Sequence, residues 1–251
     1  MGRQNSAEYE QLIQADDLIS GAEAFGVSVT DEMADQFLLY NRMLLEWNHK
    51  LNLTALTEPD DVLHKHFLDS LSGVMVLRGR EISKLADVGS GAGFPGIPLK
   101  IIRPDLEVTL IDSLGKRVDF LNEVIEHLGL RGIAAIHARA EESGHSIEHR
   151  EQYDCCVTRA VSALPVISEY CLPLVRVGGT FIAYKGPDHL EELRSAGHAL
   201  EILGSDEAQL QTYNIGPPGD RASRALIVIS KTRNTPAKYP RRAGKPNKKP
   251  L

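Results

Sequence analysis

The stretch "DVGSGAGFPGIP" (residues 87–98) holds four glycines and two prolines and directly follows the short apolar run 84–86. Glycine allows left-handed backbone conformations and removes the side chains that would keep a bound molecule away from the peptide. A glycine-rich turn after a buried strand is typical of the carboxyl edge of an open α/β sheet, where such sheets bind ligands. The stretch therefore predicts an α/β fold with a binding cleft at this turn.

Apolar strands and helices alternate from residue 84 onward. We expect strands at 84–88, 107–112, 133–137, 153–158 and 179–184, and helices at 94–103, 115–128, 163–175 and 188–203. This alternation indicates a mainly parallel, doubly wound sheet. Two more strand-like runs, 208–214 and 225–231, flank the turn-rich stretch 216–220 and should form a hairpin. The sequence thus predicts a mainly parallel seven-stranded sheet with an antiparallel C-terminal strand.

The first 80 residues show helical periodicity. Helices are expected at 7–25, 31–48 and 60–77. In the second helix, apolar residues at helical spacing form one stripe: Met33, Phe37, Tyr40, Leu44 and Trp47. Such a stripe is typical of packing. We therefore expect an N-terminal helical layer (1–80), the sheet domain (81–232) and a C-terminal tail (233–251).

The composition is that of an ordinary globular protein, with 42% hydrophobic and 25% charged residues among 251. No apolar stretch approaches the roughly 20 residues that span a bilayer, so we expect neither secretion nor a membrane span. The three cysteines lack metal-ligand spacing, which suits a reducing cytoplasm. Cys155 and Cys156 are neighbours and should point to opposite faces of one strand as small buried hydrophobes.

Charge is distributed unevenly along the chain. Residues 231–251 hold eight of the 28 Lys and Arg and none of the 34 Asp and Glu, so a basic tail follows a strongly acidic body. A basic, proline-punctuated tail indicates a polyanionic partner. The alternative is a solvated, disordered end that only keeps the protein in solution.

Two interpretations of the glycine turn imply different ligands. Residues 91–96 match the dinucleotide fingerprint G-x-G-x-x-G, whereas residues 87–93 match D-x-G-x-G-x-G, with a carboxylate at the end of the strand. A pyrophosphate prefers helix N–H groups and no fixed anion nearby, and Asp87 would repel it. S-adenosylmethionine carries a sulfonium and an ammonium group and no phosphate. An acid beside the bare backbone of Gly89, Gly91 and Gly93 therefore favours S-adenosylmethionine.

Two further acidic positions complete this candidate cofactor site. Asp112 ends the second strand about twenty residues after the turn, where a carboxylate can accept both ribose hydroxyls. The stretch 139–142, "RAEE", follows the third strand, where a backbone amide and an acidic side chain could recognise the adenine edge. Glu141 and Glu142 could instead be an exposed helix start that the helix dipole favours.

Several particular segments extend this pattern from residue 52 to residue 250. They are "NLTALTEPDDVLHKHFLDSL" (52–71), "DVGSGAGFPGIPLKI" (87–101), "DSLGKRVDFL" (112–121), "RAEE" (139–142), "TRAV" (158–161), "YKG" (184–186) and "NTPAKYPRRAGKPNKKP" (234–250). With these segments the chain resembles the ribosomal RNA small subunit methyltransferase G family. The glycine turn occurs in many methyltransferases, but "GFPGIPL" with "DSLGKR" and "TRAV" is far more particular.

The resemblance implies a class I S-adenosylmethionine-dependent methyltransferase with a Rossmann-like fold. It implies transfer of a methyl group to N7 of one guanine in bacterial 16S ribosomal RNA, either as RNA or in the small ribosomal subunit. It also implies cofactor contacts from Gly89, Phe94, Asp112, Ser113, Leu114, Ala140, Glu141 and Arg159. We expect a cytoplasmic, monomeric enzyme.

The reaction fits the residues that are present and absent. Guanine N7 has an in-plane lone pair, so positioning can supply the rate without a general base. The loop after the fourth strand begins with residues 159–161, "RAV". It has neither the Asn/Asp-Pro-Pro-aromatic tetrad expected for adenine amino methylation nor a Pro-Cys nucleophile for carbon methylation.

Basic residues near the cleft could contact the RNA and act in catalysis. Arg159 could reach guanine O6 or the methionine carboxylate, and Lys185 could hold an RNA phosphate. Lys116, Arg117 and the basic tail could extend this positive path, with Tyr239 available for stacking on a base.

The histidines do not predict a metal site. His64 and His66 are two positions apart and fit one helix face poorly, and no third ligand cluster is evident. We expect His66 and Asp69 to pair and order their helix near the cleft.

Two other functions fit parts of the pattern. A nicotinamide-dependent oxidoreductase would use the G-x-G-x-x-G register, but the chain lacks a recognisable catalytic Tyr-x-x-x-Lys and Asp87 stands against it. A non-enzymatic ribosome-assembly factor could retain the cofactor pocket as structure alone.

Overall fold

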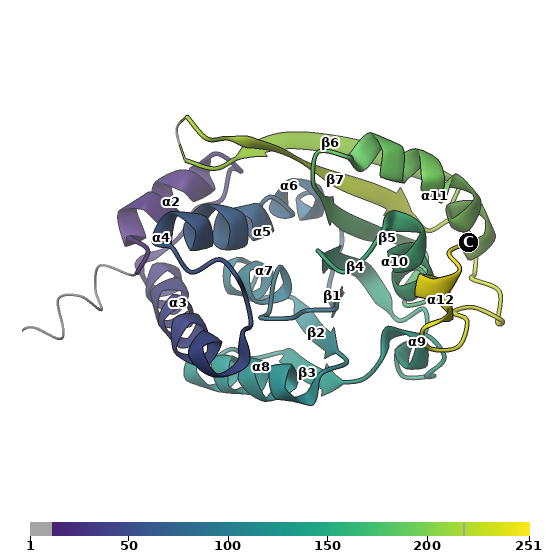
Figure 1. Ribbon diagram of the computed structural model, residues 1–251, viewed down its shortest axis with the longest axis horizontal. Coiled ribbons are helices and arrows are strands. Elements are labelled where there is room, and N and C mark those ends of the chain that lie inside the picture. Colours follow the sequence, from purple (N-terminus) through teal and green to yellow (C-terminus); the bar gives the residue numbers. More distant parts are fainter. Residues whose placement is uncertain (1–11, 218) are drawn as a thin grey trace, which may run out of the picture.

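The computed structural model describes residues 12–217 and 219–251. In this part of the chain, seven strands form one sheet in the order β3-β2-β1-β4-β5-β7-β6, flanked by helices (Figure 1). Strands β1 to β5 are parallel, and β7 pairs antiparallel with both β5 and β6. The predicted mainly parallel sheet with an antiparallel C-terminal strand is confirmed.

The strands lie close to their expected positions. Their bounds are β1 (Lys84–Val88), β2 (Glu107–Asp112), β3 (Ile133–His137), β4 (Tyr153–Arg159), β5 (Val175–Lys185), β6 (Glu207–Ile215) and β7 (Ala222–Ser230). Strand β5 begins four residues before the expected 179, and the helix before it ends four residues earlier than expected. Pro173 explains both shifts, because proline cannot continue a helix.

The helices of the sheet domain and tail are of two kinds. The longer ones, α7 (Gly96–Ile102), α8 (Gly115–His127), α10 (Leu164–Cys171) and α11 (His189–Leu203), were expected from periodicity. The short ones, α9 (Ala140–Ser143) and α12 (Lys245–Lys248), were not. Four residues are little more than one helical turn and cannot display a repeat of 3.6 residues.

The N-terminal layer contains more elements than expected. They are α2 (Ala15–Glu23), α3 (Asp31–Leu51), α4 (Pro59–Asp61), the π-helix η1 (Val62–Leu68), α5 (Asp69–Leu71) and α6 (Val74–Leu77). The expected helix 60–77 is thus interrupted, by π-helical geometry at 62–68 and by a break at Gly73, which packs against the hydroxyl of Tyr184. The part of the expected helix 7–25 that precedes residue 12 lies outside the described residues. No helix among the described residues is long and apolar enough to cross a membrane.

Two apolar cores cover the two faces of the sheet. One contains Phe37, Tyr40 and Leu44 of the predicted stripe together with side chains of α7 and α8. The other contains side chains of α10, α11 and the tail. Cys155 belongs to the first core and Cys156 to the second, as their neighbouring strand positions predict.

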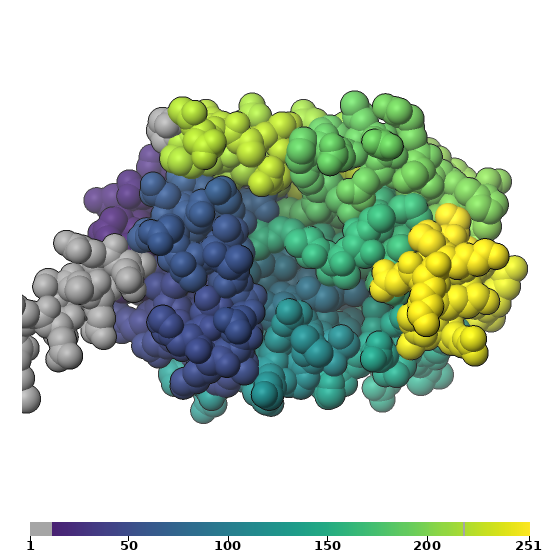
Figure 2. Space-filling model, in the orientation of Figure 1, coloured from purple at the N-terminus to yellow at the C-terminus, as the bar shows by residue number. Residues whose placement is uncertain are grey.

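The tail is folded onto the sheet domain. Lys231 and Tyr239 are buried, and the yellow C-terminal residues lie against the flank of the molecule in Figure 2. The alternative of a disordered, solvated end is therefore wrong for the tail as a whole. Short α12 packs against α10, near the carboxyl edge of the sheet (Figure 1).

Candidate functional site

The turn after β1 has the left-handed backbone that its glycines predict. Gly89, Gly91 and Gly93 have φ values of 72°, 59° and 97°. A Cβ atom on Gly89 would lie 2.5 Å from Cγ2 of Val161, whereas the nearest atom to a Cβ on Gly91 would be 3.9 Å away. The backbone at Gly91 therefore faces open space, and the glycine there leaves room for a ligand.

Asp87 lies behind this turn and not in the open cleft. Its side chain is fully buried, and Oδ2 accepts a hydrogen bond from the Gly96 N–H at 2.9 Å. Oδ1 has no hydrogen-bond partner in the described part of the chain. Burial raises the pKa of Asp87 to about 7, against the opposing effects of the Gly96 N–H and the Arg159 charge. Asp87 therefore fixes the start of α7 and is only partly ionised near neutral pH, which weakens the electrostatic argument drawn from its sequence position.

Asp112 joins the glycine turn to the end of β2. Its Oδ2 accepts from the Gly91 N–H at 2.8 Å and its Oδ1 from the Leu114 N–H at 2.9 Å. Asp112 is 3% exposed, but a carboxylate has about four acceptor positions, so neither oxygen has used its full capacity to accept hydrogen bonds. Ser113 and Leu114 are exposed beside it. Leu114 (52% exposed) and Val161 (40%) are among the few exposed large hydrophobic residues described, and they follow the carboxyl ends of β2 and β4.

Arg159, at the end of β4, is largely buried and connects the sheet domain to the N-terminal layer. Its Nη1 donates to Asp69 Oδ2 at 2.7 Å and to the backbone oxygens of Lys65 and His66 at 3.0 and 3.2 Å. The guanidinium carbon lies 5.1 Å from the centre of the Phe94 ring, a cation–π distance. Asp69 also accepts from the Tyr213 hydroxyl at 2.7 Å. Arg159 thus lies at the carboxyl end of β4, but its Nη1 is engaged within the protein, and its contact with guanine or with the cofactor stays a prediction.

His66 and Phe94 form the layer under Arg159. The two rings are stacked with centres 4.5 Å apart. Nδ1 of His66 lies 3.3 Å from Nη2 of Arg159, and Nε2 lies 2.8 Å from the Thr54 hydroxyl. Burial, reinforced by the Arg159 charge, lowers the pKa of His66 to about 3. A neutral ring therefore accepts from Arg159 and donates to Thr54, and the expected direct pairing of His66 with Asp69 is replaced by contacts of both with Arg159.

The short helix α9 places Ala140 and Glu141 near the end of β2, because the Ala138 N–H bonds to the Asp112 carbonyl. Glu141 is 7% exposed, and its carboxylate accepts from the Gly244 N–H at 2.9 Å. Burial and the Glu141 charge raise the pKa of Tyr170 to about 12. The Glu141 side chain is thus engaged with the tail, a contact across 103 positions that sequence reasoning did not find.

Lys185 is less accessible than its sequence position suggests. Its Nζ lies 2.6 Å from Glu192 Oε2 and donates to the Ser162 carbonyl at 2.7 Å, and the side chain is 8% exposed. In this conformation Lys185 fixes the loop after β4 and does not extend toward a phosphate. No group of three or more potential metal ligands occurs among the described residues.

Some cations of the tail pair with acidic side chains, and others are exposed. Lys231, Arg233 and Arg241 pair with Glu151, Asp206 and Glu169. Arg233 is exposed in its pair. The other exposed tail cations are Lys238, Arg242, Lys245, Lys248 and Lys249. Lys116 is also exposed, whereas Arg117 is half-buried, 3.6 Å from Asp112. Tyr239 is 7% exposed and packs in the second core, so the expectation that it stacks on RNA bases is wrong for this conformation.

Comparisons with known proteins bear on both sequence and fold. A family model described as "rRNA small subunit methyltransferase G" matches residues 33–219. The chain is 51% identical over 234 residues to a "Ribosomal RNA small subunit methyltransferase G" of Acetivibrio thermocellus, which covers 93% of this chain and 95% of the relative. It is 48% identical over 234 residues to the protein of that name in Alkaliphilus metalliredigens, covering 93% and 97% of the two chains.

A solved structure supports the fold alone. The precorrin-6Y C5,15-methyltransferase of Geobacter metallireducens aligns with a TM-score of 0.51 and 15% identity. The alignment covers 65% of this chain and 87% of that one.

Proposed function

The chain belongs to the ribosomal RNA small subunit methyltransferase G family, and we propose that it methylates N7 of a guanine in 16S ribosomal RNA with S-adenosylmethionine as methyl donor. The observation that carries the assignment to this family is the 51% identity over nearly the whole chain. Family membership stands against both the nicotinamide-dependent oxidoreductase and the assembly factor without activity.

The residues at the carboxyl edge fit this cofactor. Gly91 leaves its backbone open to a ligand, the Asp112 carboxylate has acceptor positions for ribose hydroxyls, and Leu114 offers an apolar surface for the adenine ring. When bound, S-adenosylmethionine supplies an electrophilic methyl group. We assign Gly89, Gly91, Gly93 and Asp112 to cofactor binding, Asp87 to support of the turn, and Ser113, Leu114 and Ala140 to the adenosine side.

The chain's own residues need only bind and orient the reactants. Guanine N7 attacks with its lone pair and requires no proton transfer. Both ring nitrogens of His66 are occupied, and the buried Asp87 is hydrogen-bonded to α7, so neither is placed to act as a base. Arg159 has Nη1 engaged with Asp69 and with two backbone oxygens, so its other N–H groups would be the ones to contact the methionine carboxylate or guanine O6. Phe94 packs against its guanidinium.

We propose that the exposed tail cations contact RNA phosphates. Arg242, Lys245, Lys248 and Lys249 belong to the same folded segment as α12, which packs against α10. Lys and Arg side chains on a fixed support can bind the sugar–phosphate backbone without reading sequence. The enzyme would act as a monomer in the bacterial cytoplasm, where ribosomal subunits are modified.

Labelled S-adenosylmethionine tests this function directly. The purified protein is incubated with unmethylated small ribosomal subunits or with naked 16S rRNA, and the RNA is digested to nucleosides. We expect label in 7-methylguanosine, at about one methyl group per RNA molecule for a single target guanine. Label in another nucleoside, or none with either substrate, would contradict the proposal.

A further inference from the structure

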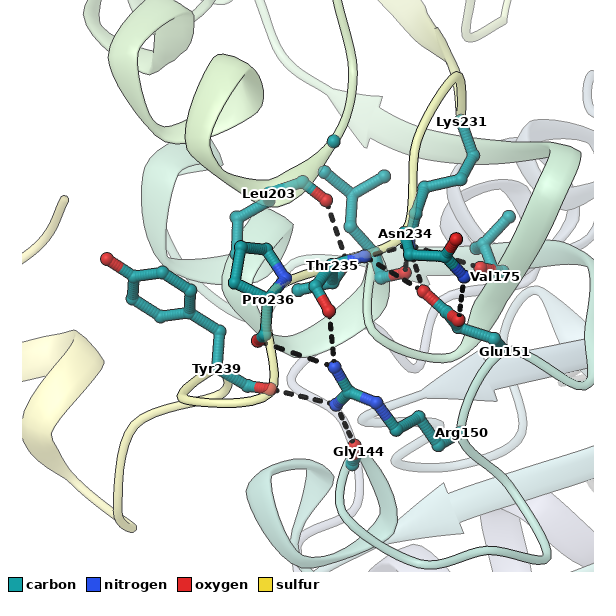
Figure 3. Close-up of polar contacts among 12 residues, drawn as sticks. Gly144, Arg150, Glu151, Val175, Leu203, Lys231, Asn234, Thr235, Pro236 and Tyr239 are labelled. Carbon is teal, nitrogen blue, oxygen red and sulfur yellow. Dashed lines mark hydrogen bonds and ion pairs between the residues drawn. The ribbon is translucent and has the colours of Figure 1, made fainter.

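Polar contacts with Glu151 and Arg150 hold the start of the tail (Figure 3). The Lys231 side chain is fully buried, with Nζ 3.4 Å from Glu151 Oε1. Burial lowers the pKa of Lys231 to about 8, against the effect of the Glu151 charge. Arg150 donates to the carbonyl oxygens of Gly144, Thr235 and Tyr239 at 2.6, 2.7 and 2.8 Å. These contacts hold the start of the tail in one conformation.

A second buried ion pair fixes the following residues. Glu169 on α10 is fully buried, and Arg241 binds it through its backbone N–H at 2.7 Å and through Nε and Nη2 at 2.8 and 2.6 Å. A buried carboxylate without partners is strongly destabilising. The pair therefore locks the segment 239–249 onto α10.

The same segment holds α9 and the loop after β4. The Gly244 N–H donates to Glu141 at 2.9 Å, and the His145 ring nitrogen Nε2 lies 2.6 Å from the Pro240 oxygen. The Ser162 hydroxyl donates to Asn247 at 3.1 Å. The segment 239–249 thus contacts three elements, α9, α10 and the loop 160–162, that stand around the carboxyl edge of the sheet.

Helix α9 has only four residues and cannot maintain its own position, because isolated helices this short are unstable in water. Its place depends on the groups that contact it. Gly244 is one such group, because its N–H binds the Glu141 carboxylate. Glu141 directly follows Ala140, which we assign to the adenosine side of the cleft.

We infer that the segment 239–249 is a structural wall of the cofactor site, with Arg241 as a positioning residue for cofactor binding. Arg241 acts through Glu169 and through the Gly244 contact with Glu141, and does not touch the cofactor itself. The inference rests on the proposed cofactor but not on the RNA substrate. Cofactor affinity should therefore depend on the tail even when no RNA is present.

The test measures binding of S-adenosylhomocysteine, the product form of the cofactor, by titration calorimetry without RNA. Arg241→Gln removes the charge that pairs with Glu169, and Arg241→Lys retains it. Arg233→Gln is the matched control, because Arg233 lies in the same tail but pairs with exposed Asp206. We expect at least tenfold weaker binding for Arg241→Gln, partial recovery for Arg241→Lys, and a change below twofold for the control. Binding by a folded Arg241→Gln variant within twofold of wild type would overturn the inference.

Hydrogen exchange on the unmodified protein gives a second test that does not depend on a variant folding. Since coupling between two sites is reciprocal, S-adenosylhomocysteine should slow amide exchange in both α9 and the segment 239–249. Protection of the glycine turn without any change at Gly244 would overturn the inference. Normal binding and coupling with no methylation of RNA would instead count against the proposed function alone.

Discussion

At the scale of residues, the ion pair between Arg159 and Asp69 links the two layers of the molecule. The side chains are 11% and 7% exposed, so neither can recover its lost hydration if the other is removed. A buried charge left without its partner typically costs about 3 to 5 kcal/mol. The same two residues hold His66 and Tyr213, so the pair also orders the floor of the cleft.

We expect Asp69→Ala to lower the free energy of unfolding by about 3 kcal/mol and to weaken S-adenosylhomocysteine binding, because Arg159 loses its main partner. Urea unfolding and titration calorimetry measure the two effects. Asp61→Ala is the control, since Asp61 pairs with Lys65 on the half-exposed side of the same helical stretch and should cost at most about 0.5 kcal/mol. Equal losses for the two variants would show that the Arg159 pair has no special structural role.

Asp87 should make stability decrease as pH rises toward neutrality. Its pKa is raised from 3.8 to about 7 in the folded state, so the folded protein binds a proton that the unfolded chain releases. The stabilisation is fully present below pH 4 and is lost as pH rises through 7, by up to about 4 kcal/mol. Asp87→Asn can keep the Gly96 contact and should lack this decrease. The lowered pKa of His66 acts in the opposite direction over the same range, so the Asp87 effect is read from the difference in stability between wild type and variant, measured by urea unfolding. A difference that stays constant between pH 4.5 and 7.5 would contradict the assignment.

Asp112→Asn should weaken cofactor binding and leave the fold intact. An amide has one acceptor oxygen, so it cannot accept from both the Gly91 and the Leu114 N–H. We expect at least tenfold weaker S-adenosylhomocysteine binding and a stability loss of about 1 to 2 kcal/mol, measured by calorimetry and thermal unfolding. Asp105→Asn, at an exposed pair with Arg103, is the control. Wild-type affinity for Asp112→Asn would remove Asp112 from the cofactor site.

Sequence reasoning identified the residues whose role follows from a local pattern and missed partners that the fold brings together. The glycines and Asp112 stand at fixed places after strands, so their location at the carboxyl edge could be predicted. The burial of Asp87 could not, because it depends on α7 packing over the turn. Arg159 was placed near the cleft, but its partner Asp69 is 90 positions away and no spacing rule connects them.

At the scale of elements, the glycine turn combines two different requirements. All three glycines need a positive φ, which costs other residues roughly 1 to 2 kcal/mol. Gly89 also lies directly against Val161, whereas Gly91 has no close neighbour. Gly89 is therefore required both by its backbone conformation and by the space available, whereas Gly91 is required by its backbone conformation alone.

We expect Gly89→Ala to destabilise the protein more than Gly91→Ala, since only the former places a methyl group 2.5 Å from Val161 Cγ2. Gly91→Ala should lower stability by about 1 kcal/mol and reduce cofactor affinity by filling the open side of the turn. Adding Val161→Ala should restore part of the stability of Gly89→Ala, because it removes the clashing methyl groups. Thermal unfolding of the wild type, of the two single glycine variants and of the double variant checks this order of stability. Absence of any recovery in the double variant would show that strain alone explains Gly89.

Periodicity predicted every strand and the long helices, but it did not predict η1, α9 or α12. A π-helix arises where tertiary contacts favour a wider turn, and here the contacts come from Arg159 and Phe94. The turns α9 and α12 are stabilised by the tail and α10. Elements whose geometry depends on distant partners leave no repeat in the sequence.

At the scale of the whole molecule, the part of the chain before residue 231 is acidic and the segment 231–251 is basic. The basic segment lies beside one edge of the sheet. Pairing with Glu151, Asp206 and Glu169 offsets the charges of Lys231, Arg233 and Arg241. Four of the five remaining tail cations lie at 242–249, in the segment that packs against α10. This arrangement would direct RNA toward the cleft, because the acidic remainder repels phosphates.

Replacing Arg242, Lys245, Lys248 and Lys249 with Gln should weaken binding of 16S rRNA and make it less dependent on salt. Each lost phosphate contact should reduce the slope of log affinity against log salt by about 0.7 to 0.9. Filter binding at several salt concentrations measures the slope. Lys84→Gln with Arg131→Gln is the control, since these exposed cations lie at the amino ends of β1 and β3. An unchanged slope for the tail variant would exclude phosphate contacts there.

The inward fold of the tail has a practical consequence for handling this protein. Leu251 is half-buried and packs against the second core, only a few positions after the residues that contact α9 and α10. A purification tag or fluorescent reporter fused after Leu251 would have to emerge from a packed surface and could displace α12. Ligand affinities measured on such a fusion would then describe an altered pocket, so the chain without the fusion is the appropriate reference.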